Sequence, residues 1–323
     1  MSILNWGIIG TGWIATEMGD ALNRVNGEIY AVCSTSLEKA QKYAEKYKVK
    51  KAYGNVDDMI NDENIDIVYI ATPHNSHYQF LIQALKAGKH VFCEKAITVN
   101  DKQLEEAVTI AREKKLVICD GVTLFHMPLF KKLKEIVDSG VIGDVKMVQV
   151  NFGSCKEYDV NNRFFSKELA GGALLDIGVY ATSFARYFMR SKPNTILTTA
   201  NFFETGVDET SGIILRNPEG QMAVMALTMR AKQPKRGVVA GELGYIEVNN
   251  YPRGDKATIT YTNDGRVETI ELGETEKALD YEVKDMQDYV LNRSGEENLN
   301  YIRDVMATLT EIRKQWGMIY PFE

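Results

Sequence analysis

Short apolar segments alternate with helix-like segments over the first 120 residues of the chain. The apolar runs have the length and composition of buried strands, and the segments between them place apolar residues at the spacing of an amphipathic helix. The expected strands are 5–9, 28–33, 65–71, 89–93 and 116–119, and the expected helices are 37–47, 56–61, 78–87 and 101–114. Strict alternation of strand and helix predicts right-handed βαβ units and a doubly wound parallel sheet.

The second part of the chain changes to an alternation of apolar and polar residues with a period of two, which is typical of strands with one buried face. We expect an α/β protein in which 1–120 form the parallel sheet and 121–323 form an α+β domain with a large, mostly antiparallel open sheet. The last helix is expected to pack back on the first domain. The expected strands are 146–152, 195–203, 211–216, 221–230, 238–243, 244–248, 257–262 and 266–272, and the expected helices are 128–139, 176–190, 278–292 and 300–316.

Composition and charge narrow the class of protein. A length of 323 residues fits two domains of ordinary size, and a net charge of −6 argues against nucleic acid as a partner. No segment approaches the roughly 18–20 unbroken apolar residues of a membrane span. The N-terminal stretch lacks the basic region and cleavage site of a signal peptide. Four widely spaced cysteines without a paired pattern indicate reduced thiols and a cytoplasmic protein; they are Cys33, Cys93, Cys119 and Cys155.

A glycine motif follows the first expected strand directly. Gly10–Ala15 has the form GxGxxA between a strand and a helix. The first glycine suits a tight turn, the second lets backbone N–H groups approach a pyrophosphate, and the small Ala15 lets helix and strand pack closely. The motif alone also fits a plain turn between strand and helix without a ligand, but its position favours a dinucleotide site.

The end of the second expected strand bears on the choice of dinucleotide. An acid at this position holds the ribose 2′-hydroxyl of NAD, but the chain has Ser34–Ser36, followed by Glu38 and Lys39. Hydroxyl groups and a lysine suit a 2′-phosphate, so we expect NADP to be preferred over NAD. Ser36 also fits the N-cap of the helix at 37–47, and both interpretations can hold together.

The ends of parallel strands meet at one edge of a sheet, so the residues that follow them are expected to face one crevice. His74 and His77 have a spacing that a metal site can use, but no third ligand accompanies them, and we expect no metal. One of these histidines is expected near the dinucleotide and the other against backbone groups. The expected cofactor contacts are Gly10, Thr11, Gly12, Trp13, Ile14, Ser34, Thr35, Ser36, Lys39, Ala71, Thr72, Pro73, His74, Asn75, His77, Glu94 and Lys95.

A second glycine-rich stretch, Ala170–Tyr180, leads into an apolar run that predicts a helix. Gly171-Gly172 suits a turn where the backbone passes close to another group. On a helix, Asp176 and Tyr180 lie four residues apart on the same face, where a carboxylate and a phenol can serve a polar pocket. The stretch taken alone also fits an ordinary helix start with an acid near its N-terminus.

These motifs together resemble the glucose–fructose oxidoreductase/inositol dehydrogenase (Gfo/Idh/MocA) family, and the resemblance covers essentially the whole chain. Within the family the chain is most similar to the dimeric dihydrodiol dehydrogenases and the NADP-dependent xylose dehydrogenases, which have tyrosine at the position of Tyr180. The motifs that carry the resemblance are Gly10–Ala15, Thr72-Pro73 with His77, Ala87–Val91 with Glu94-Lys95, Gly171–Tyr180 and Gly317–Glu323.

The resemblance implies NAD(P)-dependent oxidation of a secondary alcohol, or the reverse reduction, on a sugar, polyol or cyclic diol. It implies that residues 1–120 bind the dinucleotide and that residues 121–323 bind substrate and pair subunits into a homodimer or a dimer of dimers. By position, Lys95 is catalytic, and Asp176 and Tyr180 line the substrate site. The chain departs from the family at Ala96, where the motif has proline, and at Phe125, where close relatives carry an arginine near the cofactor.

The residues themselves suggest a mechanism. A phenol with a pKa near 10 is a poor base at neutral pH, but a nearby ammonium favours the phenolate. We therefore expect Tyr180 to act as the acid and base, Lys95 to lower its pKa and hold the substrate oxygen, and Asp176 to orient Lys95 or a second hydroxyl. The roles of Lys95 and Tyr180 can also be exchanged, since a desolvated lysine can be the base. Arg163 is a further candidate for substrate contact, with a surface arginine as the alternative.

Two other hypotheses compete with a dehydrogenase. The first is a dinucleotide-binding regulator or sensor that keeps the fold without turnover. Such members of the family typically lose the lysine or the acid/base, whereas this chain keeps both. The second is a reductase that acts on another carbonyl or an imine in the same pocket.

Overall fold

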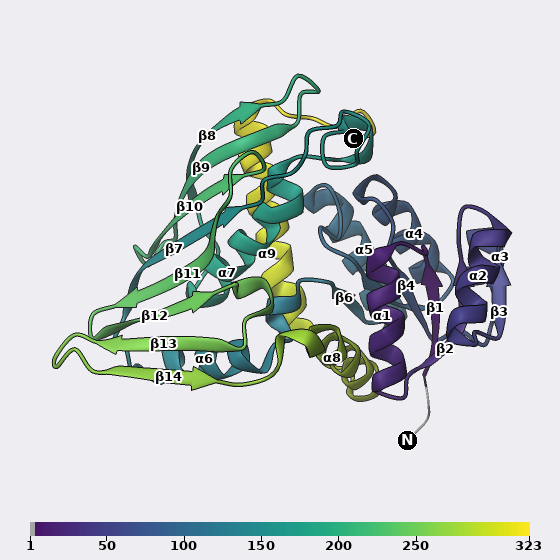
Figure 1. Ribbon diagram of the computed structural model, residues 1–323, viewed down its shortest axis with the longest axis horizontal. Helices are drawn as coiled ribbons and strands as arrows, with labels where there is room; N and C mark the ends of the chain where they lie inside the picture. The colour runs from purple at the N-terminus through teal and green to yellow at the C-terminus, as the bar shows by residue number, and fades with distance from the viewer. Residues whose placement is uncertain (1–3) are drawn as a thin grey trace. The chain divides into compact units, whose positions relative to one another are not determined.

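The computed structural model describes residues 4–323, and Figure 1 shows their helices and strands. The chain divides into two compact units. The first unit runs up to Gly121 and also contains Leu279–Leu299, and the second consists of Val122–Ala278 and Asn300–Glu323. Residues 1–3, which are part of the N-terminal stretch that we inspected for a signal peptide, lie outside the described residues.

The first unit contains a six-stranded sheet in which every neighbouring pair of strands is parallel, and this confirms the predicted doubly wound sheet. The strand order is β3-β2-β1-β4-β5-β6, so the order reverses between β1 and β4 and leaves a crevice beyond their carboxyl ends. The strands are β1 (Asn5–Ile9), β2 (Glu28–Cys33), β3 (Lys51–Tyr53), β4 (Ile67–Ile70), β5 (His90–Cys93) and β6 (Ile118–Asp120).

Local capping explains where several helices of this unit begin. Ser36 Oγ accepts a hydrogen bond from Lys39 N at 3.4 Å, and Asn100 Oδ1 accepts one from Gln103 N at 2.9 Å. Both are the N-cap contacts that the sequence predicts. The helices are α1 (Trp13–Arg24), α2 (Leu37–Tyr47), α3 (Val56–Ile60), α4 (His74–Lys86), α5 (Asp101–Lys114) and α8 (Ala278–Asn292). Asp280 of α8 forms an ion pair of 2.6 Å with Arg24 of α1.

Two predictions for this unit were incomplete. Strand β3 was not predicted, because three residues are too few to show an alternation, and β3 pairs only with β2 at the edge of the sheet. Helix α4 begins at His74 and not at the predicted Tyr78. Pro73 takes the N-cap position with extended backbone, which suits the turn before a helix. The polar residues that follow it hid the helical pattern.

The second unit contains an eight-stranded sheet of order β14-β13-β12-β11-β7-β10-β9-β8. Strands β7 and β10 pair in parallel and the other neighbours are antiparallel, so the sheet is mixed but mostly antiparallel, as predicted. The strands are β7 (Val145–Gly153), β8 (Thr195–Phe202), β9 (Asp208–Arg216), β10 (Met222–Thr228), β11 (Gln233–Gly241), β12 (Gly244–Asn249), β13 (Lys256–Tyr261) and β14 (Val267–Glu271).

Helices cover one face of this sheet, and Figure 1 shows α7 and α9 against it. Helix α7 (Val179–Phe188) contacts β7, β10 and β11, and a Cβ atom on Gly237 of β11 would lie 2.3 Å from the Phe184 ring. The absence of a side chain at Gly237 therefore lets the helix pack closely. The other helices are α6 (Pro128–Asp138) and α9 (Glu296–Trp316), which begins four residues before its predicted start at Asn300.

The opposite face of the sheet carries an exposed apolar row. Leu197 on β8 pairs with Ile214 on β9, which pairs with Val224 on β10. Their exposed fractions are 61%, 37% and 38%. Directly paired residues of neighbouring strands lie on the same face, so the three side chains form one continuous strip.

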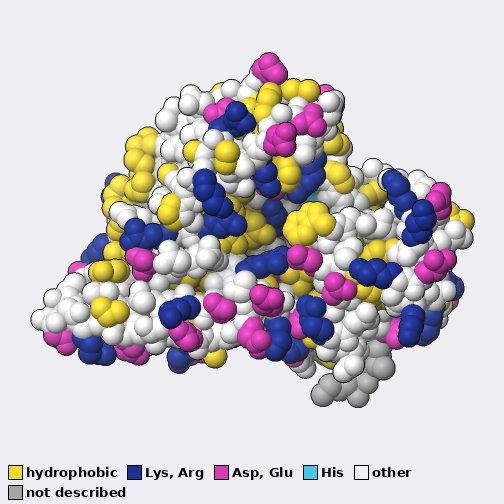
Figure 2. All heavy atoms as spheres, in the orientation of Figure 1, with side chains coloured by type: hydrophobic (Ala, Val, Ile, Leu, Met, Phe, Trp, Pro, Cys, Tyr) yellow, Lys and Arg dark blue, Asp and Glu magenta, His cyan; other side chains and the backbone are white. Residues whose placement is uncertain are grey.

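Figure 2 shows acidic and basic side chains interspersed over the drawn face. Among residues 4–323, no helix has both the length and the apolar character needed to cross a bilayer. All four cysteines are free thiols, and three of them are buried.

Candidate active site

The glycine turn after β1 is shaped by close backbone contacts. Gly10 has a φ of +107°, and a Cβ atom there would lie 2.4 Å from the carbonyl oxygen of Ala71, so no other residue fits. Gly12 is the N-cap of α1, and a Cβ atom there would meet nothing within 4 Å. No side chain caps α1, and its first turn contains no acid. The turn therefore leaves open space beside backbone N–H groups that suit an anion.

A cavity of about 750 Å³ lies at this turn, within the first unit. Nine of the predicted cofactor residues line it: Gly10, Thr11, Gly12, Ser34, Thr35, Lys39, Ala71, Thr72 and Pro73. The other eight do not line it: Trp13, Ile14, Ser36, His74, Asn75, His77, Glu94 and Lys95.

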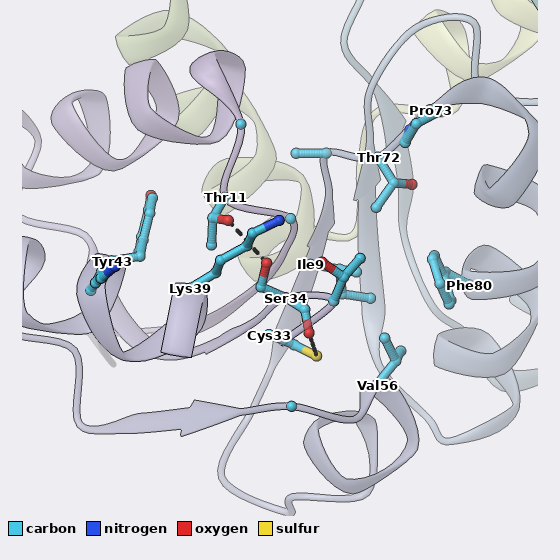
Figure 3. A pocket seen from close by; sticks show the side chains of 16 residues that line it. Ile9, Thr11, Cys33, Ser34, Lys39, Tyr43, Val56, Thr72, Pro73 and Phe80 are labelled. Atoms are coloured by element: carbon cyan, nitrogen blue, oxygen red, sulfur yellow. Dashed lines mark hydrogen bonds between the residues drawn. The ribbon is translucent and has the colours of Figure 1, made fainter. Parts of the chain in front are cut away.

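Hydroxyl and ammonium groups gather at the end of β2. Thr11 Oγ1 and Ser34 Oγ share a hydrogen bond of 3.0 Å, and Figure 3 shows Lys39 reaching toward this pair. Lys42 also lines the cavity and forms an ion pair of 2.7 Å with Glu38. Glu38 is exposed, and its carboxylate is paired with Lys42. This acid is therefore not directed to the hydroxyl groups of Thr11 and Ser34.

Seven lining residues were not predicted: Ile9, Cys33, Lys42, Tyr43, Gly54, Val56 and Phe80. Lys42 and Tyr43 lie one helical turn beyond Lys39 on α2, so helical periodicity counted from Lys39 points to them. Tyr43 is anchored, since its hydroxyl donates to the carbonyl oxygen of Ala15 at 2.6 Å and burial raises its pKa. Gly54 and Val56 follow the unpredicted strand β3, which explains why they were missed.

The two histidines of α4 both contact backbone. His77 is fully buried, with Nε2 2.7 Å from the carbonyl oxygen of Thr72 and Nδ1 2.9 Å from that of Ala96. His74 Nε2 lies 3.1 Å from the carbonyl oxygen of Lys95. A neutral imidazole carries one N–H and can donate to one carbonyl, whereas the imidazolium donates to two. His77 therefore links the turn after β4 to the peptide that carries Lys95.

Glu94 and Lys95 directly follow β5, and they differ in how deeply they are buried. Glu94 is buried, and its Oε1 accepts a hydrogen bond of 2.5 Å from the Tyr69 hydroxyl. Burial and the Glu94 charge together hold the pKa of Tyr69 well above its usual range. Lys95 is half-buried, and the peptide bond that joins it to Ala96 is cis. The tyrosine thus fixes the residue that precedes Lys95.

In the second unit, the Gly171-Gly172 turn also has close neighbours, as the sequence predicted. A Cβ atom on Gly171 would lie 2.7 Å from the carbonyl oxygens of Arg163 and Phe164. Gly172 has a φ of +112°, and a Cβ atom there would lie 2.3 Å from Asp208 Oδ1. Both positions therefore require glycine.

Asp208 supports this turn from the start of β9. Its side chain is fully buried, and Oδ2 accepts a hydrogen bond of 2.7 Å from Leu174 N. Oδ1 has no hydrogen-bond partner within residues 4–323. Burial raises the pKa of Asp208 to about 7, although the Leu174 N–H and the charge of Arg313 oppose that shift. Sequence analysis missed Asp208, since an acid at a strand start carries no signal of this contact.

The C-terminal segment also supports the Gly171-Gly172 turn. The Tyr320 hydroxyl donates to the carbonyl oxygen of Gly171 at 2.7 Å. Arg313 holds both carboxylate oxygens of Glu323 at 2.7 Å, and its guanidinium lies 4.7 Å from the centre of the Tyr320 ring. The C-terminal motif Gly317–Glu323 is therefore hydrogen-bonded to the Gly171-Gly172 turn.

Asp176 and Tyr180 follow the turn on a continuous helical segment. Leu174–Gly178 form a π-helical turn (η3) that leads into α7, whereas an ordinary helix was predicted from Asp176 to Arg190. Asp176 is buried, and its Oδ1 lies 3.8 Å from Arg163 Nη1. The Tyr180 ring is half-buried, with its centre 6.2 Å from that of Phe152. A π-helical turn within a helix is frequent at functional sites.

Phe125, one of the two positions where we expected a departure from the family's pattern, is a core residue. Its exposed fraction is 1%, and its ring lies 5.5 Å from that of Tyr187 and 5.8 Å from that of Tyr301. The Phe125 side chain therefore offers no polar group to a cofactor, unlike an arginine.

Comparison with known proteins gives a consistent result over both units. Residues 4–122 match the family model described as "Oxidoreductase family, NAD-binding Rossmann fold", and residues 130–247 match "GFO/IDH/MocA C-terminal domain". Trans-1,2-dihydrobenzene-1,2-diol dehydrogenase of Mus musculus is 31% identical over 251 residues, which cover 76% of this chain and 74% of that protein. The enzyme of the same name from Xenopus laevis is 29% identical over 328 residues, or 98% and 99% of the two chains.

Solved structures share the fold. A 3-ketoreductase from Actinomadura kijaniata in complex with NADP and TDP-benzene aligns with a TM-score of 0.86 and 21% identity over 97% of this chain and 98% of that chain. Levoglucosan dehydrogenase in complex with NADH and levoglucosan aligns with a TM-score of 0.89 and 19% identity over 98% and 99%.

The chain belongs to the Gfo/Idh/MocA oxidoreductase family. It is an NAD(P)-dependent oxidoreductase of that family, as the resemblance implies.

Proposed function

We propose that this protein transfers a hydride between C4 of the nicotinamide and a secondary alcohol or carbonyl carbon of a sugar, polyol or cyclic diol. The observation that carries the proposal is the cavity at the glycine turn, where open space adjoins an uncapped helix N-terminus. Relatives named for a dihydrobenzene diol and for levoglucosan support an alcohol carbon as the reacting centre.

The residues around the cavity fit a dinucleotide. The open space at Gly12 suits the pyrophosphate, and the hydroxyls of Thr11 and Ser34 suit the adenosine ribose and its substituent. Val56 and Phe80 add apolar lining that suits an adenine ring. When bound, the nicotinamide supplies the carbon that accepts or donates the hydride.

Three side chains are proposed to carry the chemistry on the protein side. Tyr180 takes the proton of the substrate hydroxyl, Lys95 holds the substrate oxygen and favours the phenolate, and Asp176 orients Lys95 or a second hydroxyl. The burial of Asp176 and the partial burial of Tyr180 and Lys95 support these roles. The exchanged assignment, with Lys95 as the base, is the alternative.

NADP is proposed as the preferred cofactor. The end of β2 offers Ser34, Thr35 and the Lys39 ammonium to a 2′-phosphate, and Glu38 is held by Lys42. Ser34→Asp is expected to weaken NADPH binding at least about tenfold, because the new carboxylate repels the 2′-phosphate. The same carboxylate accepts a 2′-hydroxyl, so NADH binding is expected to stay equal or become tighter.

Fluorescence titration with both dinucleotides measures this change. Ser139→Asp, which adds the same charge at an exposed position of the second unit, is the control and is expected to leave both dissociation constants unchanged. Equal losses of NADPH and NADH affinity in Ser34→Asp would show that Ser34 does not discriminate between the dinucleotides.

The function itself is tested by following NADPH absorbance with purified protein and a panel of pentoses, hexoses, polyols and cyclic diols in both directions. We expect turnover of at least one member, with NADP as the better cofactor. Tight NADPH binding without turnover on any member would favour the regulator hypothesis, and turnover of carbonyls or imines alone would favour the reductase hypothesis.

Self-association through the eight-stranded sheet and a cytoplasmic location complete the proposal. The exposed row of Leu197, Ile214 and Val224 is apolar and continuous, which supports a homodimer or a dimer of dimers. Sedimentation velocity of the native chain distinguishes these states from a monomer.

The free thiols support a reducing compartment.

A further inference from the structure

Two cationic side chains of the second unit lie against one aromatic ring. Lys156 Nζ is 4.0 Å from the centre of the Phe164 ring, and the guanidinium carbon of Arg163 is 4.2 Å from the same point. Both side chains are half-buried. Two like charges beside the same ring repel each other, and the repulsion grows as water is excluded from around them.

The protein supplies little negative charge to this pair. Within the described part of the chain, no carboxylate lies within 4 Å of Lys156, and Arg163 has one such neighbour, Asp176, at 3.8 Å. That separation is too long for a hydrogen bond. Arg163 therefore keeps its N–H donors for another acceptor, and Lys156 keeps all three of its own.

Further basic groups surround the same stretch. Arg230 Nη1 donates to the carbonyl oxygen of Lys156 at 3.3 Å. Lys235 Nζ lies 4.9 Å from the centre of the Phe152 ring, which contacts Tyr180. Four cationic side chains thus lie in this part of the second unit, with Asp176 and Glu204 as nearby carboxylates, and the larger number of cations favours an anionic ligand over a neutral one.

We propose that Lys156 and Arg163 bind an oxyanion carried by the substrate, either a carboxylate or a phosphate. This inference rests on the proposed function, because Asp176, the neighbour of Arg163, is a proposed substrate residue. The planar guanidinium matches two oxygens of one oxyanion, and the ammonium adds a point charge. The Phe164 ring holds both charged groups in place before the ligand arrives, which reduces the entropy lost on binding.

The experiment compares neutral sugars with their acidic counterparts. Calorimetric titration of the protein, with and without NADPH, uses D-glucose against D-glucuronate and D-glucose 6-phosphate, and D-galactose against D-galacturonate and D-galactose 6-phosphate. We expect at least one acid to bind at least tenfold more tightly than its neutral parent. A preference among uronates identifies a carboxylate, and a preference among phosphate esters identifies a phosphate.

Variants locate the effect on the two cations. Lys156→Gln and Arg163→Gln are each expected to reduce the preference for the acid, which is the ratio of the dissociation constants of the neutral parent and the acid, at least fivefold. Arg266→Gln is the matched control, since Arg266 lies 4.0 Å from the centre of the Tyr261 ring but is paired with Glu268. Its preference for the acid is expected to match that of the native protein.

The outcomes separate this inference from the proposed function. Acids that bind no better than their parents, or variants that weaken neutral and acidic ligands alike, would overturn the oxyanion site even if neutral polyols are turned over. A protein that binds an acid through Lys156 and Arg163 but shows no NADPH-dependent turnover would retain the site and refute the dehydrogenase. Unchanged NADPH affinity in both variants shows that they are folded.

Discussion

Lys95→Ala is expected to lower kcat by a factor of about 10²–10⁴, because it removes the cation proposed to hold the substrate oxygen and to favour the phenolate of Tyr180. Lys95 follows β5 and does not line the cavity at the glycine turn, so NADPH affinity is expected to change by less than about threefold. Steady-state kinetics on the best substrate of the panel, together with fluorescence titration of NADPH, measures both quantities.

Lys86→Ala is the matched control, since Lys86 is an exposed lysine at the end of α4 in the same unit. Tyr180→Phe separates the two assignments of the base. If Tyr180 is the base, its loss lowers kcat for alcohol oxidation as much as that of Lys95 and removes the fall of kcat on the acidic side of the pH profile, where the phenolate takes up its proton. Full kcat in Lys95→Ala would refute the catalytic role of this lysine.

The hydrophobic pattern located the parallel sheet because its strands are buried on both faces. Every residue of β4 is buried, for example, and an unbroken apolar run is the sequence signature of such a strand. The start of α4 was not predicted, for the opposite reason. His74 and His77 are buried through contacts with backbone carbonyl oxygens, and a pattern of apolar positions does not record polar residues that are satisfied in this way.

The glycine turn of the second unit shows which structural features the local sequence can predict and which it cannot. Gly171-Gly172 predicted a close approach, and the approach is there, but the groups that approach come from distant segments. Asp208 contacts Leu174 across 34 positions, and Tyr320 contacts Gly171 across 149. No local spacing carries such pairs, since they depend on how β9 and the C-terminal segment pack. The π-helical form of Leu174–Gly178 was missed as well, because the apolar residues on either side of Asp176 are equally compatible with an ordinary helix.

The residues that line the cavity were also predicted only in part. The lining residues Gly10, Thr11, Gly12, Ser34 and Thr35 were predicted because they follow a strand directly, where ligands of parallel sheets bind. Lys42 and Tyr43 were missed although they lie on the predicted helix, because only Lys39 in the first turn of that helix was assigned to the dinucleotide. Gly54 and Val56 depend on β3, whose three residues give no pattern.

Asp208→Asn is expected to remove a pH-dependent loss of stability. The pKa of Asp208 is raised to about 7 in the folded protein, against about 3.8 as its ordinary value. Below about pH 4 the carboxyl is protonated in both folded and unfolded states, and its contribution to stability is complete. Between about pH 4 and 7 the unfolded chain releases this proton first, so the native protein loses about 4 kcal/mol of unfolding free energy from this group. Asparagine stays neutral and avoids this loss.

Urea unfolding at several pH values between 4 and 8, followed by the fluorescence of Trp316 in the second unit in a variant without the other two tryptophans, measures the effect. The difference in unfolding free energy between Asp208→Asn and the native residue is expected to shift in favour of asparagine by about 4 kcal/mol from pH 4 to pH 7 and then to stay constant. Asp264→Asn, at an exposed turn, controls for the loss of one surface charge. Parallel pH profiles for Asp208→Asn and the native protein would show that the burial of Asp208 does not raise its pKa, and that the Leu174 N–H and Arg313 compensate for it.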